Sequence, residues 1–282
     1  MSDAEILIQP IEEALDYHRL KNETGSKLNA EQWGSAVPVQ IREVSQASAT
    51  VESAGYLQRI QDGINEILSH ARSELGGLFN RSRFLDDLTH LATEEGLRPK
   101  ADSSKFGSLQ DVGSIARTDL IYEMQVGSAY GYAEWSRGME GADLRLYPAL
   151  ELVRIRNSIK KRDWNTRWIE AGQAVGWSGA IEHPHIALKT SPIWRKLSRF
   201  DRAFPPFDFN SGMWTEPVNR ETAIRFGLAT KTSTQKPDEK PYAEHWETSV
   251  ADLSDELRDS LREAFPKSVK IVGDVAKWRK PK

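Results

Sequence analysis

The segment from Ile186 to Phe226 constrains the fold more than any other part of the chain. It gathers aromatic residues and prolines around one short polar turn, Asn210-Ser211-Gly212. Trp and Phe bury a large apolar area per residue, and Asn and Gly supply the backbone conformations that tight turns need. The segment therefore predicts a small packed module with an aromatic core. Its members are Trp194, Pro205, Pro206, Phe207, Phe209 and Trp214.

Size and composition set the limits for the rest. A chain of 282 residues, 39% of them hydrophobic, can bury a full core in one large or two modest domains. Its apolar runs are only a few residues long, and its N-terminus is acidic where a secretion signal would be basic and then apolar. We therefore expect no contact with a membrane. The absence of cysteine excludes disulfides, cysteine nucleophiles and cysteine-based metal sites.

The sequence contains none of the standard catalytic signatures. It lacks the glycine-rich loops that hold ATP or dinucleotides, the G-x-S-x-G motif and the H-E-x-x-H motif. Glu182, His183 and His185 could begin a metal site, because an extended Glu-His-Pro-His segment places both imidazoles on one side. A distant third ligand would still be needed, so a solvated or hydrogen-bonded loop is the favoured interpretation. We expect no enzymatic activity, cofactor, metal or small-molecule substrate.

Basic residues are concentrated in one stretch of a chain whose net charge is -3. Residues 1–99 carry 9 Lys and Arg against 16 Asp and Glu, whereas residues 151–202 carry 11 against 5. This basic stretch could face an acidic protein surface or nucleic acid. A solvated or protein-facing surface is the favoured interpretation, and direct DNA contact is the alternative. The candidate residues are Arg154, Arg156, Lys161 and Arg162.

Helical periodicity dominates the first half of the chain. Apolar residues recur every three or four positions over residues 56–78 and again over residues 84–92, which predicts two amphipathic helices. Pro10 suits the first turn of an earlier helix, which we expect over residues 10–22. A weaker segment begins at Trp33.

A long central helix follows. Ser108 and Asp111 resemble a capping pair, so we expect the helix to run from there to about Trp135. Gly127 and Gly131 either weaken this helix locally or let another element pack closely against it.

Beyond residue 138 the pattern changes to short extended and helical segments. An extended segment is expected over residues 150–159, a short strand over residues 186–188, and a helix over residues 164–172. Ser191-Pro192 and Asn219 each begin a further helix. The fold class is therefore α+β, with a helical N-terminal half, a long central helix and a small mixed α/β module with short strands.

Three regions follow from these patterns. Residues 1–138 form a helical N-terminal region, and residues 139–228 form a small aromatic-rich α+β module. Residues 229–282 form a C-terminal arm that starts as a polar, proline-containing linker. Within the arm we expect a helix over residues 253–265 and an edge strand over residues 269–272.

Several separated blocks resemble a known family. Residues 10–33 suit an N-terminal helix and Trp-containing turn, and residues 121–135 hold an Ile-Tyr block that ends in Ala-Tyr. Residues 147–155 form a Pro-aromatic strand, and residues 186–226 run from a helix through a Pro-Pro turn into a Trp-bearing strand. In this order the blocks resemble the phage Mu F-like minor head proteins, also called phage head morphogenesis proteins.

The chain departs from that family at several positions. Met124 and Gln125 stand where the family commonly has Thr and Asn, and residues 161–172 lack the His of the corresponding block. Many relatives carry Asn-Cys-x-Cys at the Pro-Pro turn, where this chain has Asn210-Ser211-Gly212-Met213. Sulfur ligation is therefore impossible here, and we expect the turn to act as a scaffold.

The resemblance implies a low-copy minor head protein without an established reaction. Such a protein acts with the portal and major capsid proteins, in the host cytoplasm during assembly and then in the virion head. The alternative is a DNA-binding protein of the packaged genome or a DNA-processing protein, which steep salt dependence of binding would distinguish.

We assign framework roles to the signature residues. Those of the long helix, chiefly its two tyrosines, are expected to pack it against the C-terminal module. Three tryptophans are expected to form the core of that module, and the Pro-Pro turn is expected to orient its strand. The residues are Tyr122, Ala129 and Tyr130 in the helix, Trp164, Trp168 and Trp194 in the core, and Pro205, Pro206, Asn210 and Gly212 at the turn.

Overall fold

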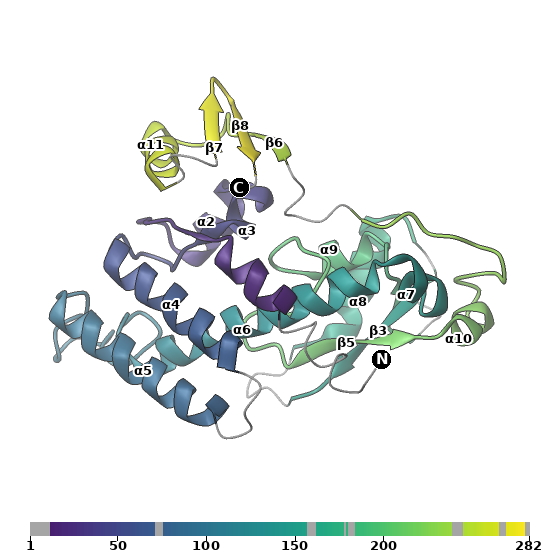
Figure 1. The fold of residues 1–282 in the computed structure, drawn as a ribbon, viewed down its shortest axis with the longest axis horizontal. Coiled ribbons are helices and arrows are strands. Elements are labelled where there is room, and N and C mark those ends of the chain that lie inside the picture. The colour runs from purple at the N-terminus through teal and green to yellow at the C-terminus, as the bar shows by residue number, and fades with distance from the viewer. Residues whose placement is uncertain are drawn as a thin grey trace. The chain divides into compact units, whose positions relative to one another are not determined.

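The fold class is α+β, as predicted (Figure 1). The chain divides into two compact units. One unit contains Gly127–Glu239, and the other contains Ile11–Val126 with Lys240–Lys282. Helix α6 (Ile115–Gly138) passes through the boundary, so the chain divides inside this helix and not at residue 138. The computed structural model describes residues 12–70, 76–156, 162–177, 179, 184–238, 245–264 and 269–279.

Two antiparallel helices, α4 (Ala54–His70) and α5 (Gly76–Glu94), form the clearest layer of the unit that contains residues 11–126 (Figure 1). The predicted periodicity is real, because Leu57, Ile60 and Ile64 of α4 are completely buried. Gly63 lets α5 approach closely, since a Cβ there would lie 2.6 Å from the ring of Phe84. The first helix was predicted to reach residue 78, but that position belongs to α5.

The N-terminal elements of this unit are short. Residues 12–19 are helical, and α2 (Ala30–Ala36) and α3 (Val39–Glu43) follow. Strands β1 (Asn22–Glu23) and β2 (Ser45–Gln46) pair in parallel. Asn29 forms a capping box with Gln32, so α2 begins before Trp33.

Helix α6 starts later than predicted. Ser114 caps it, because its Oγ accepts a hydrogen bond from Arg117 N at 3.1 Å. Asp111 is fully buried and instead accepts hydrogen bonds from Arg98 and from the backbone N–H groups of Gly107 and Gly113. The Arg98 hydrogen bond is the main cause of the lowered pKa of Asp111. The expected capping residue therefore organises the loop before the helix.

A buried polar cluster lies beneath α4. His18 is completely buried, and its Nδ1 lies 3.0 Å from Asn65 Oδ1. Burial, reinforced by the charge of Lys21, lowers the pKa of His18 to about 3, so its imidazole is neutral at physiological pH. Lys21 donates from Nζ to Gln125 Oε1 at 3.0 Å, and Gln61 donates to the Lys21 carbonyl at 2.7 Å.

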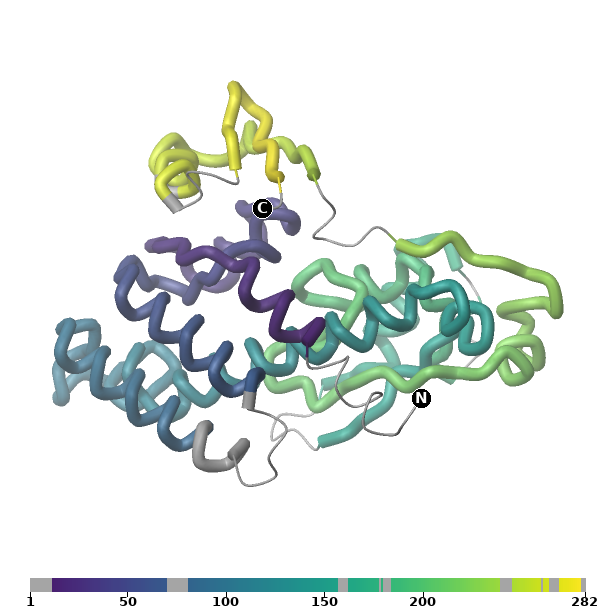
Figure 2. Tube along the Cα trace, viewed as in Figure 1, coloured from purple at the N-terminus to yellow at the C-terminus, as the bar shows by residue number. Residues whose placement is uncertain are grey.

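The C-terminal arm contains a small antiparallel sheet in the order β6 (His245–Ser249), β8 (Val275–Arg279), β7 (Val269–Val272). Helix α11 (Asp255–Ala264) lies between β6 and β7 in the chain, and Figure 2 traces this segment in yellow. Trp246 and Trp278 stack across β6 and β8. The predicted helix and edge strand are confirmed, whereas β6 and β8 were missed.

The unit that contains residues 127–239 is built on a three-stranded antiparallel sheet. Its order is β4 (Ile186–Leu188), β3 (Ala149–Arg154), β5 (Met213–Val218), which leaves β5 as an edge strand. A small core of Ala149, Ile186, Val218 and Ala223 packs this sheet against a helix capped by Asn219, as predicted. The helices of this unit besides α6 are α7 (Gly141–Leu146), α8 (Trp164–Ala174), α9 (Ile193–Leu197) and α10 (Arg220–Arg225).

Residues 229–238 are attached to this same unit. Gln235 accepts a hydrogen bond from Thr190 Oγ1 at 2.8 Å and donates to the Pro148 carbonyl at 2.8 Å. Arg220 donates to the carbonyls of Thr230 and Ser233. The first part of the predicted linker is therefore held by specific bonds.

None of the helices in the described ranges has the length and apolar character needed to cross a bilayer.

Candidate functional site

The aromatic core predicted from the sequence forms in the structure. Trp168 and Trp194 are completely buried, with their rings 5.3 Å apart, and Phe207 stacks on Trp194 at 6.0 Å. Trp164 is also buried, on the same helix as Trp168. Trp194 Nε1 donates to the Leu188 carbonyl at 2.9 Å, which satisfies its polar atom. With their faces covered by protein, these rings serve packing and not base stacking.

The Pro-Pro turn packs directly on helix α6. The Pro205–Pro206 peptide is cis. A Cβ on Gly131 would fall inside the carbonyl oxygen of Pro205, whereas a Cβ on Gly127 would lie 3.6 Å from Pro206 Cδ. Of the two roles expected for these glycines, close packing therefore explains Gly131. Arg202 is buried here and donates to Ser128 Oγ at 2.9 Å.

The turn that follows needs two left-handed residues, Asn210 (φ 49°) and Gly212 (φ 63°). A salt-bridge cluster fixes the chain just before it. Asp208 is buried, and Arg167 donates to its Oδ2 at 2.8 Å. Arg162 donates to the carbonyls of Phe209 and Asn210 and lies 3.5 Å from Asp208. The scaffold role expected of the turn thus has a physical basis.

Of the two tyrosines expected to pack α6 against the C-terminal module, Tyr122 contacts helix α5. Tyr122 lies against Phe84 and beneath the guanidinium of Arg81, both on α5. Ala129 is buried, and Tyr130 is half-buried, with its pKa raised by that burial. Tyr132 and Trp135 of α6, for which no role was predicted, each contact Phe204 with ring centres 5.7 Å apart. These residues belong to the unit that contains residues 127–239, here called the aromatic unit.

The expected basic surface is reduced. Arg154 and Arg156 are exposed at the end of β3. Arg162 is committed to the turn, so its prediction as a partner-facing residue is corrected to a structural role. Lys161 lies outside the described residues.

The histidine segment offers no metal site in the part that the structure describes. Glu182 and His183 lie outside that part, and His185 Nε2 lies 3.2 Å from Asn165 Oδ1 while its ring packs on Trp168. Burial lowers the pKa of His185, and Glu151 opposes the shift. Among the described residues, no group of three His, Asp or Glu side chains could hold a metal ion.

The structure reveals a pocket that the sequence did not predict. It has a volume of about 430 Å³ and lies between the end of α6 and strand β5, within the size range of small-ligand and side-chain sites. Its apolar walls include Trp135, Met139, Leu150, Phe204, Trp214 and Pro217, and its charged lining consists of Glu134, Arg137, Asp143, Lys189 and Glu216.

Two charged groups in this pocket have perturbed pKa values. Lys189 is buried and donates to the Gly138 carbonyl at 3.1 Å, and its Nζ lies 3.5 Å from Asp143. Burial lowers the pKa of Lys189, and Asp143 opposes the shift. Glu134 is exposed overall, but partial desolvation of its carboxyl raises its pKa, although Trp214 Nε1 donates to it at 2.8 Å. Such shifts in a concave site are typical of binding positions.

Sequence periodicity could not identify this pocket, because its walls come from separate elements. Trp214 and Glu216 are two residues apart on one strand, so their side chains share a face. This is the single local signal that links two of the lining residues. Neither a protein-family model, nor a curated protein, nor a solved structure matches the chain.

Proposed function

We propose that this chain is a structural protein that acts through its surfaces and not through turnover. The proposal rests on the structural role of residues 186–226, the segment that constrains the fold most. Trp194, the Pro-Pro turn, Asn210 and Gly212 all serve packing or chain direction. Together with the missing catalytic motifs, this favours a scaffold that presents outer surfaces to other proteins.

Within that class, we infer a minor component of a phage or prophage head. The order of the sequence blocks supports this inference, since it resembles that of the Mu F-like minor head proteins. Three blocks, residues 147–155, 161–172 and 186–226, also belong to one compact unit built on one sheet. The partners would be the portal and major capsid proteins, met in the host cytoplasm during assembly and retained in the virion head.

The DNA-binding alternative has lost part of its support. It needs a cluster of free cations, and Arg162 is bound to Asp208 and to two carbonyls of the turn. Arg154 and Arg156 remain exposed. A double charge reversal, Arg154→Glu with Arg156→Glu, tests the alternative. If these arginines do not contact DNA, DNA retention in assembled heads stays unchanged. Loss of retained DNA from otherwise normal heads would favour direct DNA contact.

Complementation tests the proposal itself. The gene is deleted from the producing phage or prophage, and the wild-type protein is supplied from a plasmid. Head morphology and the fraction of DNA-filled heads are then scored by electron microscopy. We expect few or malformed heads without the protein and recovery with it. Normal numbers of filled heads in the deletion strain would overturn the proposal.

A further inference from the structure

The pocket beside β5 lies at an open sheet edge. It contacts four consecutive strand residues, Trp214, Thr215, Glu216 and Pro217. Since side chains alternate between the two faces of a strand, a cavity that touches four in a row follows the strand edge. Within the described residues, no further strand pairs with the outer side of β5.

The register shows which backbone groups this edge presents. Leu152 of β3 donates its N–H to the His185 carbonyl, on the β4 side of the sheet. Thr215 is the residue opposite Leu152 on β5. In an antiparallel ladder, Thr215 must therefore direct its own N–H and C=O away from β3. The backbone nitrogen of Pro217, two residues further along, also points away from β3. Its missing N–H therefore removes no hydrogen bond from the sheet.

The charges of the pocket favour a cation. Its charged lining contains three carboxylates and two basic groups. Lys189 is already paired with Asp143, so Glu134 and Glu216 outnumber the remaining Arg137, whose charge acts on Glu134. Glu134 Oε2 accepts from Trp214 Nε1, and no described residue donates a hydrogen bond to Glu134 Oε1. The indole of Trp214 adds an aromatic face, which attracts ammonium and guanidinium groups.

We propose that this site binds an extended segment of a partner protein that carries an Arg or Lys side chain. The segment pairs with the Thr215 backbone and extends the sheet beyond β5. Its basic side chain enters the pocket between Glu134 and Glu216 and lies against Trp214. This inference holds whether or not the partner is a head protein, so its failure would leave the proposed function standing.

A pair of short peptides tests the site on the full-length protein. The probes are the acetylated and amidated peptides TVRVT and TVQVT, which differ only in the charge and length of the central side chain. Binding is followed through the Trp214 indole N–H signal in nitrogen-15 NMR spectra, identified by its loss in Trp214→Phe. We expect TVRVT to shift this signal and to bind at least about ten-fold more tightly than TVQVT, since about 1.4 kcal/mol is a factor of ten.

Two kinds of variant separate the backbone and charge contributions. Thr215→Pro removes the outward N–H while leaving the β3 pairing intact, so it should abolish TVRVT binding without changing the near-ultraviolet circular dichroism spectrum. Glu134→Gln and Glu216→Gln keep side-chain shape and should each weaken TVRVT binding about ten-fold. The proposal is overturned if neither peptide shifts the indole signal, if both bind equally, or if a folded Thr215→Pro variant binds as the wild type does.

Discussion

The α4–α5 helix pair and the aromatic unit reach stability by different routes. In the pair, aliphatic residues at helical spacing form two facing stripes, and one glycine allows the close approach. In the aromatic unit, tryptophans, hydrogen-bonded arginines and left-handed residues fix short elements that are far apart in the sequence. The pair therefore draws its stability from many similar apolar contacts, whereas the aromatic unit depends on a few specific ones.

Two glycines of one helix give the strongest test of this contrast. Gly131→Ala should disrupt the aromatic unit, at a cost on the order of 3 kcal/mol or more, because the new methyl group would overlap the Pro205 carbonyl. Gly127→Ala is the matched control and should be neutral or stabilising by up to about 1 kcal/mol, since Ala favours the helix and Pro206 leaves room. Thermal unfolding followed in the near-ultraviolet would compare them. Equal melting temperatures would refute the close approach.

Arginine substitutions should show the next largest difference. Arg162→Ala removes the bonds to Phe209, Asn210 and Asp208, and we expect a loss of about 2 kcal/mol. Arg154→Ala changes an exposed side chain and should stay within about 0.5 kcal/mol of the wild type. Chemical denaturation of the two variants measures both values. A neutral Arg162→Ala would return this residue to the candidate partner surface.

Burial of His18 makes the stability of the unit that contains residues 11–126 depend on pH. His18 has its pKa lowered from 6.5 to about 3, so below pH 6.5 the unfolded chain takes up a proton that the folded chain does not. Stability from this group is complete above pH 6.5 and falls by up to about 1.4 kcal/mol per pH unit as pH decreases toward 3.

A comparison with His18→Gln isolates this contribution. Between pH 7.5 and 5.5 the wild type should lose about 1.4 kcal/mol more than the variant, measured by urea denaturation followed by far-ultraviolet circular dichroism. Identical pH dependence in the two proteins would show that His18 is not buried as a neutral group.

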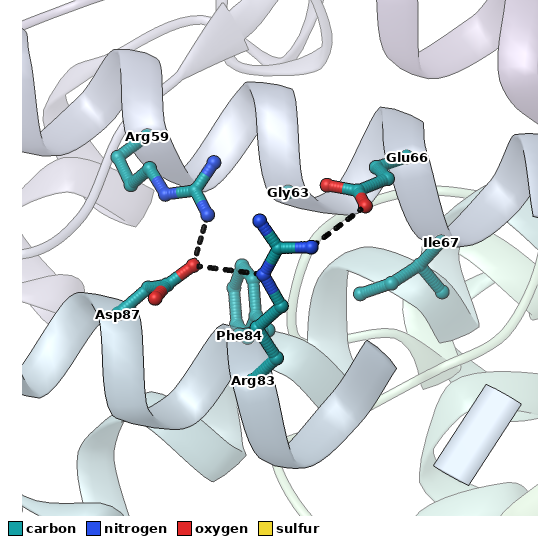
Figure 3. Close-up of a pocket in the computed structure, with 7 residues that line it drawn as sticks. All are labelled: Arg59, Gly63, Glu66, Ile67, Arg83, Phe84 and Asp87. Atoms are coloured by element: carbon teal, nitrogen blue, oxygen red, sulfur yellow. Dashed lines mark hydrogen bonds and ion pairs between the residues drawn. The ribbon is translucent and has the colours of Figure 1, made fainter. Parts of the chain in front are cut away.

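The smallest effect is expected between α4 and α5. Figure 3 shows Asp87 facing both Arg59 and Arg83, while Arg83 also lies 3.6 Å from Glu66. The Arg83 side chain is 66% exposed, so water and salt screen its ion pairs. Arg83→Ala should therefore cost less than about 1 kcal/mol in chemical denaturation. A cost equal to that of Arg162→Ala would erase the contrast between the two regions.

The sequence predicted local features better than tertiary ones. The stripes of α4 and α5, the Asn219 cap and the fold class follow from spacing and local chemistry, and the structure confirms them. Asp111 misled the prediction of where α6 begins, because an acidic residue before a helix resembles a cap until its ion-pair partner Arg98 is known.

The candidate site shows the same limit. Aromatic content predicted the Trp168–Trp194 core. Charge counting placed Arg162 on a partner surface, since it could not reveal the carbonyls of the turn that this side chain binds. The pocket at β5 was missed because Glu134 and Trp214 are distant in the chain and meet only after folding.

Quantitative mass spectrometry of purified heads tests the proposed role most directly. Heads from the producing phage or prophage are digested, and the peptides of this protein are counted against those of the portal protein. We predict a few copies per portal assembly, retained after the heads are washed in high salt. Complete absence from mature heads would contradict assignment as a minor head component.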